Sequence, residues 1–491
     1  MNPTGYTENA LLLVDQMGQA DESAIAGGTP GETLMENAGK AIADAIIDRW
    51  QPQPTAILCG PGNNGGDGFV VARLLQEEGW PVRLGLMGNA SALKGDAKIH
   101  SERWQGPIES LDTALLEDST LVVDALFGAG LSRPPSGEAL TILQAIDDRT
   151  CVAVDMPSGV DGNNGEILGF APLAHLTITF FRKKPGHLLY PGRRNCGELL
   201  VADIGIPEIV LEEISPNQAE NSPNLWLDKL PPHNPEQHKF SRGYAVICGS
   251  AEMPGAAILA AAGARRTGLG MVTMAVPKEG SAVYRLGVPG GVTRTVRDTA
   301  TFSEVIEDPR VNAVLIGPGH GISVATRERA LAALRLEIPT VLDADAITVF
   351  GDCKDLLLST LKGPCILTPH EGEFKSLFDH EGDKLSRARA AAQECDAVIL
   401  LKGADTVVAA PDGRAVINTN APPTLATAGA GDVLAGIVTA FLARGMPAFE
   451  AAIAGAWLHG EAAARFGAGL IAEDIPEMIP KILKQIEFRQ Y

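Results

Sequence analysis

The chain has 491 residues, of which 45% are hydrophobic and 20% are charged, a balance typical of globular proteins. Because one compact core rarely organises so long a chain, we expect two domains. Its 60 acidic and 40 basic side chains give a formal net charge of −20, which repels nucleic-acid phosphates and anionic lipids. The composition therefore argues against a nucleic-acid-binding protein, a collagen, a coiled coil and a disordered scaffold.

The cysteines and the first residues bear on the cellular compartment. The 7 cysteines form no C-x-x-C pair and no spacing with histidine that would close a zinc site. The start of the chain lacks the basic region of a signal peptide. The longest run of small apolar residues, 255–264, is shorter than the roughly 18 residues that a membrane span needs. We therefore expect a soluble, cytoplasmic protein with reduced thiols and no membrane partner.

The first element along the chain is an amphipathic helix. The run Thr29-Pro30-Gly31-Glu32 has the form of a capping box with proline at the first helical position. Apolar residues then recur at helical spacing from residue 34 to residue 50. We expect this helix to open the N-terminal domain.

Short apolar runs that stop at glycine or aspartate then alternate with helical patterns, as parallel strands do in α/β units. In the first half these runs are 56–59, 121–123 before Asp124, and 152–154 before Asp155. In the second half they are 244–248, 313–316, 341–342, 365–367 and 398–401. Ligands of such sheets bind beyond the carboxyl ends of the strands, so we expect functional residues directly after these runs.

A polar, proline-bearing stretch separates the two halves. Residues 207–238 show no sustained periodicity, which predicts a linker. The predicted domains are residues 1–218 and residues 225–491. No repeat of fixed period is present, so the expected fold class is α/β, with two open α/β domains.

The glycine-rich run GPGNNGGDG (60–68) follows a predicted strand and precedes an apolar helical run, 69–75. Glycines at such a junction allow positive φ and a close approach to a ligand, and a helix N-terminus offers free N–H groups to phosphate. Asn63, Asn64 and Asp67 interrupt the run, so it is neither a Walker loop nor a dinucleotide fingerprint. The alternative is a tight turn without a ligand.

Asp124 and Asp155 each end a predicted strand, and the loop after Asp124 combines glycines with the cation of Arg133. Asn64, Asp124 and Ser158 all carry oxygen donors that suit a hard cation. Asp155 then remains as a candidate acid or base. For each aspartate, helix capping or turn formation is the alternative.

In the second half, the small residues of TAGAGDVLAG (427–436) allow a tight turn into an apolar helix, whose first N–H groups would face an anion beside Asp432. An aspartate that accepts a hydroxyl proton while backbone amides stabilise a phosphoryl group is a kinase arrangement. The alternative is an ordinary helix start with a dipole-pairing aspartate.

Further loops follow other predicted strands of the second half. The run KGADT (402–406) combines a lysine, backbone amides and a hydroxyl, a set suited to an adenine nucleotide, although a surface turn is the alternative. Gly319 and His370 lie in two more such loops. A lone histidine such as His370 is more often structural than a ligand.

The motifs of the first half resemble those of a known family. The order LMENAG (34–39), GPGNNGGDG, VVDALFGAGLSRP (122–134), VDMPSGVDG (154–162) and TFFRKKPG (179–186) is similar to the N-terminal domain of the bifunctional NAD(P)H-hydrate repair enzymes, the NAD(P)HX epimerase, over most of residues 10–210. The resemblance implies a Rossmann-like three-layer α/β/α domain, a catalytic Asp155, and a potassium ion held by Asn64, Asp124 and Ser158. The substrate-binding positions that it implies are Asn63, Asn64, Gly65, Gly66, Asp67, Gly128, Ala129, Gly130, Leu131, Ser132, Arg133, Pro134 and Asp155.

The motifs of the second half resemble the ribokinase-like superfamily and, more closely, its NAD(P)H-hydrate dehydratase branch, over nearly all of residues 238–470. They are HKFSRGYAVICGSAEMPGAAILAA (238–261), VLIGPG, VLDADAIT, LTPHEGEF, LKGADT and TAGAGDVLAG. The resemblance implies a ribokinase-like α/β domain that uses ADP and magnesium, with Asp432 catalytic. The implied substrate-binding positions are Ala256, Gly319, His370 and Asp432, and the implied nucleotide-binding positions are Lys402, Gly403, Ala404, Asp405, Thr406 and Gly431.

Together the resemblances imply an enzyme that repairs the hydrated cofactors NADHX and NADPHX. The first domain, an isomerase, would interconvert the R and S hydrates, and the second, a lyase, would dehydrate the S form with ADP, which leaves as AMP and phosphate. A homo-oligomer such as a tetramer is also implied. Two alternatives stay open: a ribokinase-like small-molecule kinase, and a first domain that is a non-catalytic nucleotide-binding module, because some relatives of that domain are scaffold or binding proteins.

Overall fold

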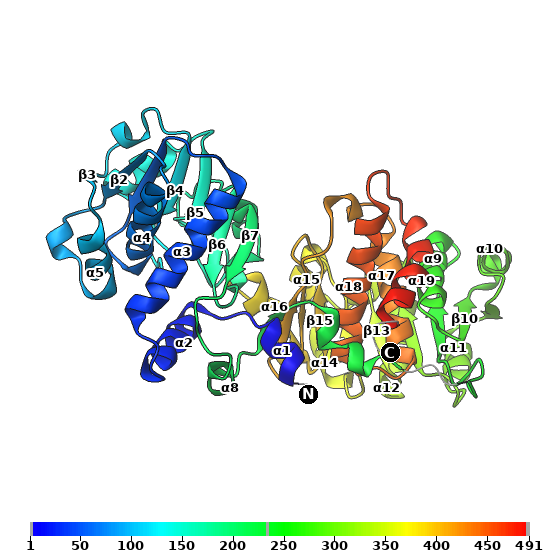
Figure 1. Ribbon diagram of the computed structural model, residues 1–491. Helices are drawn as coiled ribbons and strands as arrows, with labels where there is room; N and C mark the ends of the chain where they lie inside the picture. The colour runs from blue at the N-terminus through cyan, green and yellow to red at the C-terminus, as the bar shows by residue number, and fades with distance from the viewer. Residues whose placement is uncertain (1–2, 232–234, 488–491) are drawn as a thin grey trace. The chain divides into compact units, whose positions relative to one another are not determined.

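The computed structural model describes residues 3–231 and 235–487 and divides the chain into two compact units (Figure 1). Residues 7–218 form what we call the first unit. The second unit contains the described residues from 219 onward together with residues 3–6. Within the described ranges, no helix is both long and apolar enough to cross a membrane.

The sheet of the first unit has seven parallel strands in the order β3-β2-β1-β4-β5-β6-β7. The strands are β1 (Thr55–Cys59), β2 (Val82–Leu86), β3 (Ile108–Ser110), β4 (Leu121–Ala125), β5 (Thr150–Val154), β6 (Leu176–Phe180) and β7 (Glu198–Ala202). The helices are α2 (Val14–Ala26), α3 (Gly31–Arg49), α4 (Asn63–Glu77), α5 (Gly95–Arg103), α6 (Gly137–Gln144), α7 (Gly192–Cys196) and α8 (Val210–Ile214), while α1 (Pro3–Glu8) spans the boundary between the units. The strand order reverses between β1 and β4, and open α/β sheets bind ligands at such a switch point.

Buried side chains on both faces make this sheet the middle of three layers. Ile57 and Cys59 of β1 belong to a core that includes α3 and α4, whereas Ala56 and Leu58 belong to a core that includes α6. Alternate residues of a strand point to opposite faces, which explains the division. The predicted three-layer α/β/α arrangement is therefore confirmed.

The predicted capping box of the first long helix is wrong. The helix α3 begins at Gly31 with Pro30 as its N-cap residue, and no side chain caps its backbone. Thr29 therefore lies one residue too early to be the cap. Glu32 forms an ion pair with Arg103 of α5 instead of reaching back to the helix start.

The glycine-rich run at the end of β1 also differs from the prediction. Its residues from Asn63 onward already belong to α4, and none of its glycines has a positive φ. Close packing explains them: a Cβ on Gly65 would lie 1.9 Å from the backbone oxygen of Gly60, and one on Gly68 would lie 2.7 Å from Sγ of Cys59. The glycines let α4 begin directly against the end of β1.

The sheet of the second unit has ten strands in the order β11-β10-β9-β12-β13-β14-β15-β16-β17-β8. They are β8 (Gln218–Glu220), β9 (Tyr244–Cys248), β10 (Met271–Val276), β11 (Val292–Thr295), β12 (Ala313–Ile316), β13 (Thr340–Leu342), β14 (Cys365–Leu367), β15 (Val398–Leu401), β16 (Val407–Ala409) and β17 (Ala415–Ile417). Pairing is parallel from β11 to β15 and antiparallel from β15 to β17. The helices are α9 (Pro254–Arg266), α10 (Ser281–Gly287), α11 (Thr299–Ile306), α12 (Val324–Arg335), α13 (Asp345–Thr348), α14 (Lys354–Thr360), α15 (Glu371–Leu377), α16 (Lys384–Cys395), α17 (Ala430–Ala443), α18 (Ala448–Phe466) and α19 (Asp474–Glu487).

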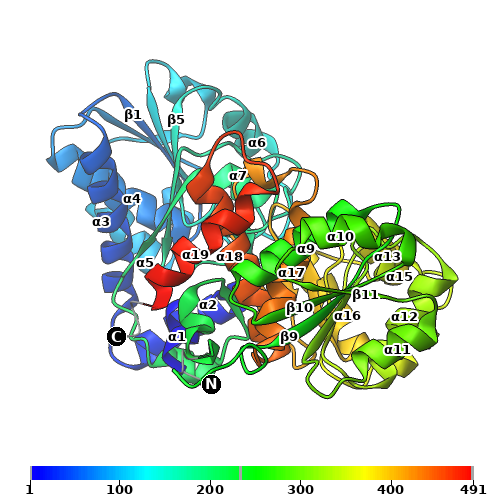
Figure 2. The same ribbon diagram turned by 90° about the vertical axis from the view of Figure 1, so that its right-hand side faces the viewer.

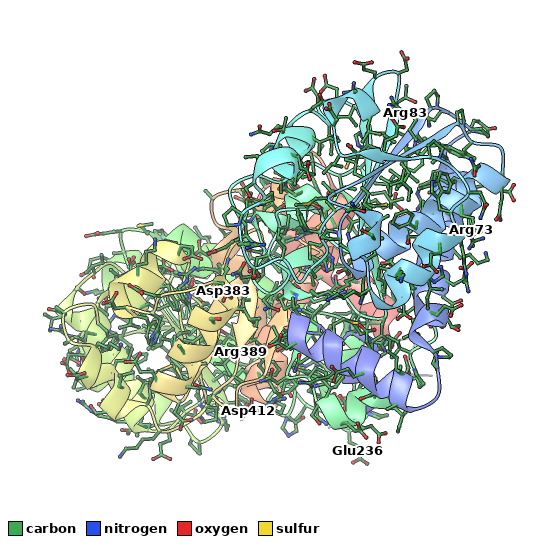
Figure 3. The ribbon with its side chains drawn as sticks, turned by 90° about the vertical axis from the view of Figure 1, so that its left-hand side faces the viewer. Arg73, Arg83, Glu236, Asp383, Arg389 and Asp412 are labelled. Carbon is green, nitrogen blue, oxygen red and sulfur yellow. The ribbon has the colours of Figure 1, made fainter. Side chains whose placement is uncertain are left out.

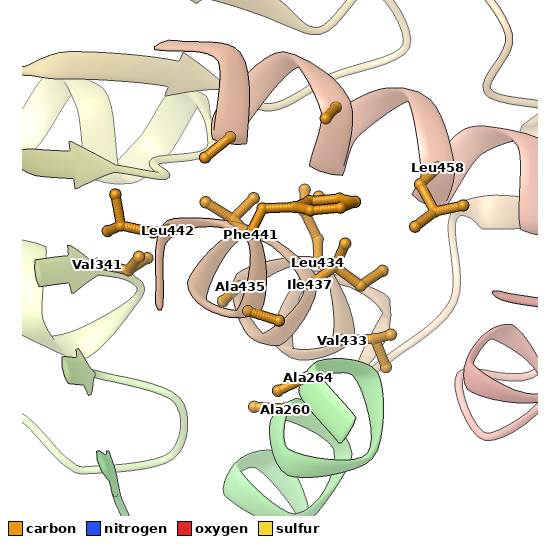
Figure 4. Packing of buried hydrophobic residues seen from close by; sticks show 14 of the residues in the cluster. Ala260, Ala264, Val341, Val433, Leu434, Ala435, Ile437, Phe441, Leu442 and Leu458 are labelled. Carbon is orange, nitrogen blue, oxygen red and sulfur yellow. The ribbon is translucent and has the colours of Figure 1, made fainter. Parts of the chain in front are cut away.

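Helix α17 lies in the middle of the core of the second unit (Figure 4). Every residue from Val433 to Ala443 is buried, as expected for a helix that is covered all round. The helices α9, α18 and α19 belong to the same core, and they lie together with α17 on one face of the sheet (Figure 2). A Cβ on Gly436 would lie 1.9 Å from the backbone oxygen of Ala260 in α9, so the glycine permits the close crossing of α9 and α17.

The stretch that was predicted as a linker is largely ordered. Residues 207–230 contain α8, β8 and two short 3-10 turns, and Trp226 is fully buried beside Trp457. Elements this short leave no periodicity that a sequence pattern reveals. Residues 232–234 of the predicted linker lie outside the described residues.

The first described residues group with the second unit, although the sequence placed them in the N-terminal domain. Tyr6 packs against the core of that unit and lines a small cavity with Arg414. Burial raises the pKa of Tyr6 to about 12. Arg414 is the neighbouring charge with the largest effect on this pKa, and Arg389 of α16 and Asp412 of the turn before β17 are two further charges in that part of the unit (Figure 3). Tyr6 therefore anchors the start of the chain in the second unit.

Candidate active sites

A cavity of about 620 Å³ lies at the carboxyl ends of β1, β4 and β5 in the first unit. The residues predicted from the sequence that line it are Asn63, Asn64, Asp67, Gly128, Ala129, Gly130, Leu131, Ser132, Arg133 and Asp155. Gly65, Gly66 and Pro134 do not line it. The cavity lies at the switch point of the sheet, where the topology places a ligand.

Asp155 lies in the wall of this cavity, directly after β5, with a φ of 62° that few non-glycine residues adopt. Its Oδ1 accepts hydrogen bonds from Nζ of Lys184 (2.7 Å) and Oγ1 of Thr179 (2.9 Å), and its Oδ2 accepts one from the backbone N–H of Ala129 (2.9 Å). Burial alone would raise the pKa of Asp155, but the charge and hydrogen bond of Lys184 lower it to about 2. Asp155 is therefore a carboxylate at neutral pH.

Lys184 is a residue of the cavity wall that the sequence did not single out. Its side chain is only 2% exposed and touches Asp155 and Thr179. His187 holds both partners, since its Nδ1 accepts from the backbone N–H of Lys184 (2.9 Å) and its Nε2 lies 2.7 Å from the backbone oxygen of Asp155. Burial lowers the pKa of His187 to about 4, so this ring is neutral. The signals in the sequence are that Lys184 follows a strand and belongs to the TFFRKKPG motif.

Two of the three predicted metal ligands touch each other. Asp124 lies within β4, one residue before its end rather than after it, and is fully buried. Its Oδ1 accepts from Oγ of Ser158 (2.6 Å) and its Oδ2 accepts from the Ser158 N–H (2.8 Å). Burial raises the pKa of Asp124 to about 6, against the effect of these hydrogen bonds. In the part of the chain that is described, no hydrogen bond joins Asn64 to either residue, and its buried Nδ2 has no partner.

In the second unit, Gly429 turns the chain into α17 with a φ of 86°. Ala430 is the first residue of the helix, and Asp432 lies in its first turn. Lys402, after β15, approaches the same point: its Nζ lies 3.7 Å from where a Cβ on Gly431 would stand. The turn and the lysine together present N–H groups and a cation, which suits a phosphate.

One basic side chain and several acidic ones lie around the start of α17. Nζ of Lys402 lies 2.8 Å from Oδ1 of Asp343 and 3.8 Å from Oε2 of Glu373. Burial raises the pKa of Asp432 to about 6, the charge of Asp343 adds to this effect, and Lys402 acts against it. Asp432 therefore has the pKa of a group that accepts or releases a proton near neutrality.

The other predicted residues of this unit have mixed surroundings. A Cβ on Gly319 would lie 2.9 Å from Cβ of Ala256, so these two positions are adjacent. His370 is the N-cap of α15 and accepts from the Glu373 N–H through Nδ1, which is the structural role that a lone histidine usually has. The side chain of Asp405 is buried against Nζ of Lys384 at 2.8 Å.

Gly403, Ala404 and Thr406 stay in one short turn after β15. Oγ1 of Thr406 donates to the backbone oxygen of Gly403 (2.9 Å) and accepts from its N–H (3.1 Å). The turn therefore holds its own shape beside Lys402.

Comparison with known proteins covers both units. Residues 31–186 match the family model described as YjeF-related protein N-terminus, and residues 244–484 match the model described as NAD(P)H-hydrate dehydratase. A relative from Moorella thermoacetica, named bifunctional NAD(P)H-hydrate repair enzyme Nnr, is 35% identical over 97% of each chain. One of the same name from Thermofilum pendens is 35% identical over 95% of this chain and 94% of its own.

The chain belongs to the bifunctional NAD(P)H-hydrate repair enzyme family. Among solved structures, an ADP/ATP-dependent NAD(P)H-hydrate dehydratase from Bacillus subtilis, co-crystallised with ATP and Mg²⁺, is 27% identical and has a TM-score of 0.48. The match covers 54% of this chain and 98% of that one.

Membership of the repair enzyme family accounts for the order of both sets of motifs. The family-model match in the first unit ends at residue 186 and includes Asp155 and Lys184. It begins only at residue 31, so α2, which also lines the cavity, lies outside it.

Proposed function

We propose that the cavity of the first unit epimerises hydrated NADH and NADPH and that the start of α17 in the second unit dehydrates the S hydrate with ADP. The proposal rests chiefly on Asp155, a carboxylate that Lys184 keeps charged in the wall of a cavity large enough for a nicotinamide nucleotide. The family to which the chain belongs supports both halves. With its 7 cysteines free in the structure, we also propose a cytoplasmic enzyme.

In the first unit, Asp155 acts as the base. Hydration places a hydroxyl on the ring carbon that is bonded to the ring nitrogen, and the R and S hydrates differ at this carbon. Removal of the hydroxyl proton by Asp155 lets that carbon form a carbonyl while its bond to nitrogen breaks. Closure of the ring on the other face of the carbonyl then gives the other hydrate.

A potassium ion fits the polar groups beneath this cavity. Asp124 and Ser158 offer oxygen donors, and the buried Asp124 carboxyl has no cationic side chain bonded to it in the described residues. The amide oxygen of Asn64, in α4, would lie 2.8 Å from a Cβ on Gly128, so this third donor is close to the loop after β4. When bound, a potassium ion would neutralise Asp124 and hold the loop after β4, and we propose these three residues as its ligands.

In the second unit, Asp432 takes the proton of the ring hydroxyl, and the hydroxyl oxygen attacks the terminal phosphoryl group of ADP, from which AMP leaves. The lone pair of the ring nitrogen then expels phosphate, and loss of a proton from the neighbouring ring carbon restores the double bond. Lys402 and the first N–H groups of α17 stabilise the transferring phosphoryl group.

Magnesium would enter this site with the nucleotide. Among the described residues, no group of three or more histidine, cysteine, aspartate or glutamate side chains forms a metal site. Mg²⁺ commonly binds through one or two carboxylates together with substrate phosphates, so the site needs no protein cage of its own. When bound, magnesium would neutralise charge that develops on the phosphates.

Recovery of NADH absorbance from a mixture of R and S hydrates, with ADP and magnesium, tests both assignments. We expect the wild type to convert the whole mixture, Asp155→Asn to stop after the S fraction, and Asp432→Asn to regenerate no NADH. Failure of the wild type to regenerate NADH would contradict the dehydratase assignment. A stable phosphorylated product would instead identify a small-molecule kinase.

A further inference from the structure

Helix α2 brings a second acidic side chain to the cavity of the first unit. Met17, Gly18, Asp21 and Ile25 all line the cavity, and their spacing places them on one side of the helix. The buried residues of α2, Met17, Ala20 and Ala24, overlap this side only at Met17. Asp21 is therefore the one charged side chain that α2 contributes to the cavity wall.

The position of α2 is held from several directions. The backbone N–H of Leu12 donates to the backbone oxygen of Lys183 (3.0 Å), next to the buried Lys184. The N–H of Val14 donates to Oδ1 of Asn163 (2.8 Å). Nε2 of Gln218 donates to Oε1 of Gln16 (2.9 Å). These contacts make the approach of Asp21 to the cavity a fixed feature of the fold.

Asp21 and Asp155 differ in how their oxygens are engaged. Asp155 already accepts three hydrogen bonds, which hold it charged and oriented. Within the described ranges, the Asp21 carboxyl makes no hydrogen bond or ion pair, although it is half-buried. A desolvated carboxyl without a protein partner costs free energy unless a ligand supplies the partner.

We propose that Asp21 is the second proton-transfer residue of this site, acting on the ring nitrogen of the hydrated cofactor while Asp155 acts on its hydroxyl. This inference rests on the proposed epimerase function. Asp155 takes the hydroxyl proton, the oxygen–carbon bond becomes a carbonyl, and the carbon–nitrogen electron pair moves to nitrogen, where it takes the proton of Asp21. Rotation about the bond to the carbonyl carbon presents its other face. Reversal of both proton transfers then closes the ring, so no atom is gained or lost.

The electrostatics of the wall agree with this role. Burial raises the pKa of Asp21 to about 6, Lys184 acts against the rise and Asp155 adds to it. Two carboxyls whose pKa values are driven apart, one to about 2 and one to about 6, are the pattern of a base and an acid in one site. The other titratable and charged groups of the cavity wall are Asp96 of α5, Arg133, and Asp67 of α4, whose pKa burial raises well above its usual value, with Asp155 and Asp21 adding to the rise.

The test compares Asp21→Asn with Glu22→Gln, which removes the same charge from the exposed neighbouring residue of the same helix. The readout is epimerisation of R hydrate by the full chain, followed by stereochemical analysis without ADP. We expect Asp21→Asn to lower kcat about 100-fold with KM changed less than about 3-fold, because general acid–base catalysis contributes at least this factor. Glu22→Gln should stay within about 2-fold of the wild type, and ADP-dependent dehydration of S hydrate should be unchanged in both variants.

The pH profile separates proton transfer from a structural role. In the wild type, kcat/KM for epimerisation should fall as the pH rises through about 6, because the protonated form of Asp21 is lost, and this limb should vanish in Asp21→Asn. Asp21→Glu should recover part of the rate. Asp21→Asn with more than a third of the wild-type rate, or with the same limb, would overturn the inference. A wild type that does not epimerise at all would instead overturn the proposed function itself.

Discussion

Asp155 lies directly after a strand, and Asp432 lies at the start of a helix. Their surroundings shift their pKa values in opposite directions. Lys184 holds the pKa of Asp155 near 2, whereas burial and the charge of Asp343 raise the pKa of Asp432 to about 6. Asp155 is therefore charged throughout the physiological range, while Asp432 changes its charge within reach of it. The same residue type supplies a permanent anion in one unit and a titrating group in the other.

Lys184→Met should destabilise the first unit. It leaves Asp155 buried without its cation, and breaking a buried ion pair on one side costs about 3–5 kcal/mol. The measurement is the free energy of unfolding of that unit by denaturant. Lys94→Met removes the same charge from an exposed residue of the same unit and should cost less than about 1 kcal/mol. Equal losses in the two variants would show that the ion pair does not stabilise the unit.

The dehydratase activity should depend on pH through Asp432. The group acts as a base, so its charged form is needed, and a pKa of about 6 means that this form is lost as the pH falls through 6. We expect kcat/KM for dehydration to rise from pH 5 to about pH 6.5 and then level off. Asp432→Asn should be at least about 100-fold slower and should lack this rise. A wild-type profile that is flat between pH 5 and pH 7 would exclude Asp432 as the base.

The sequence indicated the positions of Asp155 and Asp432 better than those of the side chains that surround them. Asp155 and Asp432 stand directly after a strand or at a helix start, where topology places ligands, so position alone marked them. Lys184 stands in a basic run, and Asp21 is one of several polar residues on a surface-like helix. Neither pattern indicates that a side chain lines a cavity, because segments that are distant along the chain form the cavity wall.

Among the elements, the strands were the easiest to predict and the helix starts the hardest. Continuous apolar runs marked β9, β12, β14 and β15 with their observed bounds, since strands buried on both faces need apolar side chains throughout. The start of α4 was missed because glycines favour turns. Here close packing against β1 requires glycines inside a helix, and only the tertiary structure shows this.

The crossing of α9 and α17 should not tolerate a larger residue. In Gly436→Ala the new methyl group would meet the backbone oxygen of Ala260 at 1.9 Å, and a backbone atom cannot rotate away. We expect a loss of about 1–3 kcal/mol in the free energy of unfolding of the second unit. Gly255→Ala, in the first turn of α9, meets nothing within 4 Å and should not destabilise the unit. If Gly436→Ala were as stable as the wild type, the packing described for α17 would be wrong.

For the whole molecule, the two separate cores predict two calorimetric transitions. ADP at 100 times its Kd should increase the free energy of unfolding of the second unit by about 2.7 kcal/mol, because a ligand stabilises only the unit that binds it. Only the transition of that unit should move to a higher temperature. Gly436→Ala should lower the midpoint temperature of the transition of the second unit, so this variant identifies which of the two transitions belongs to that unit. A shift of both transitions by ADP would place a nucleotide site in the first unit.

The division into two α/β units followed from chain length and from the order of apolar runs, but the course of the chain between them did not. The segment 207–230 carries short elements whose burial depends on residues as distant as Trp457. Tyr6 gave no signal in the sequence, because a single aromatic residue near the N-terminus has no periodic context.

The anchoring of Tyr6 has a consequence for how the protein comes apart. The first unit begins after residue 6 and ends at residue 218, so the segments that flank it on both sides belong to the second unit. A protease that cuts once near residue 218 would therefore leave the N-terminal fragment in contact with the core of the second unit through the partly buried ring of Tyr6. Burial of one aromatic ring contributes about 1.5–3 kcal/mol, less than the roughly 4 kcal/mol of a complex with a millimolar Kd, so this contact alone would not keep the cleaved halves together at the dilution of a gel-filtration column.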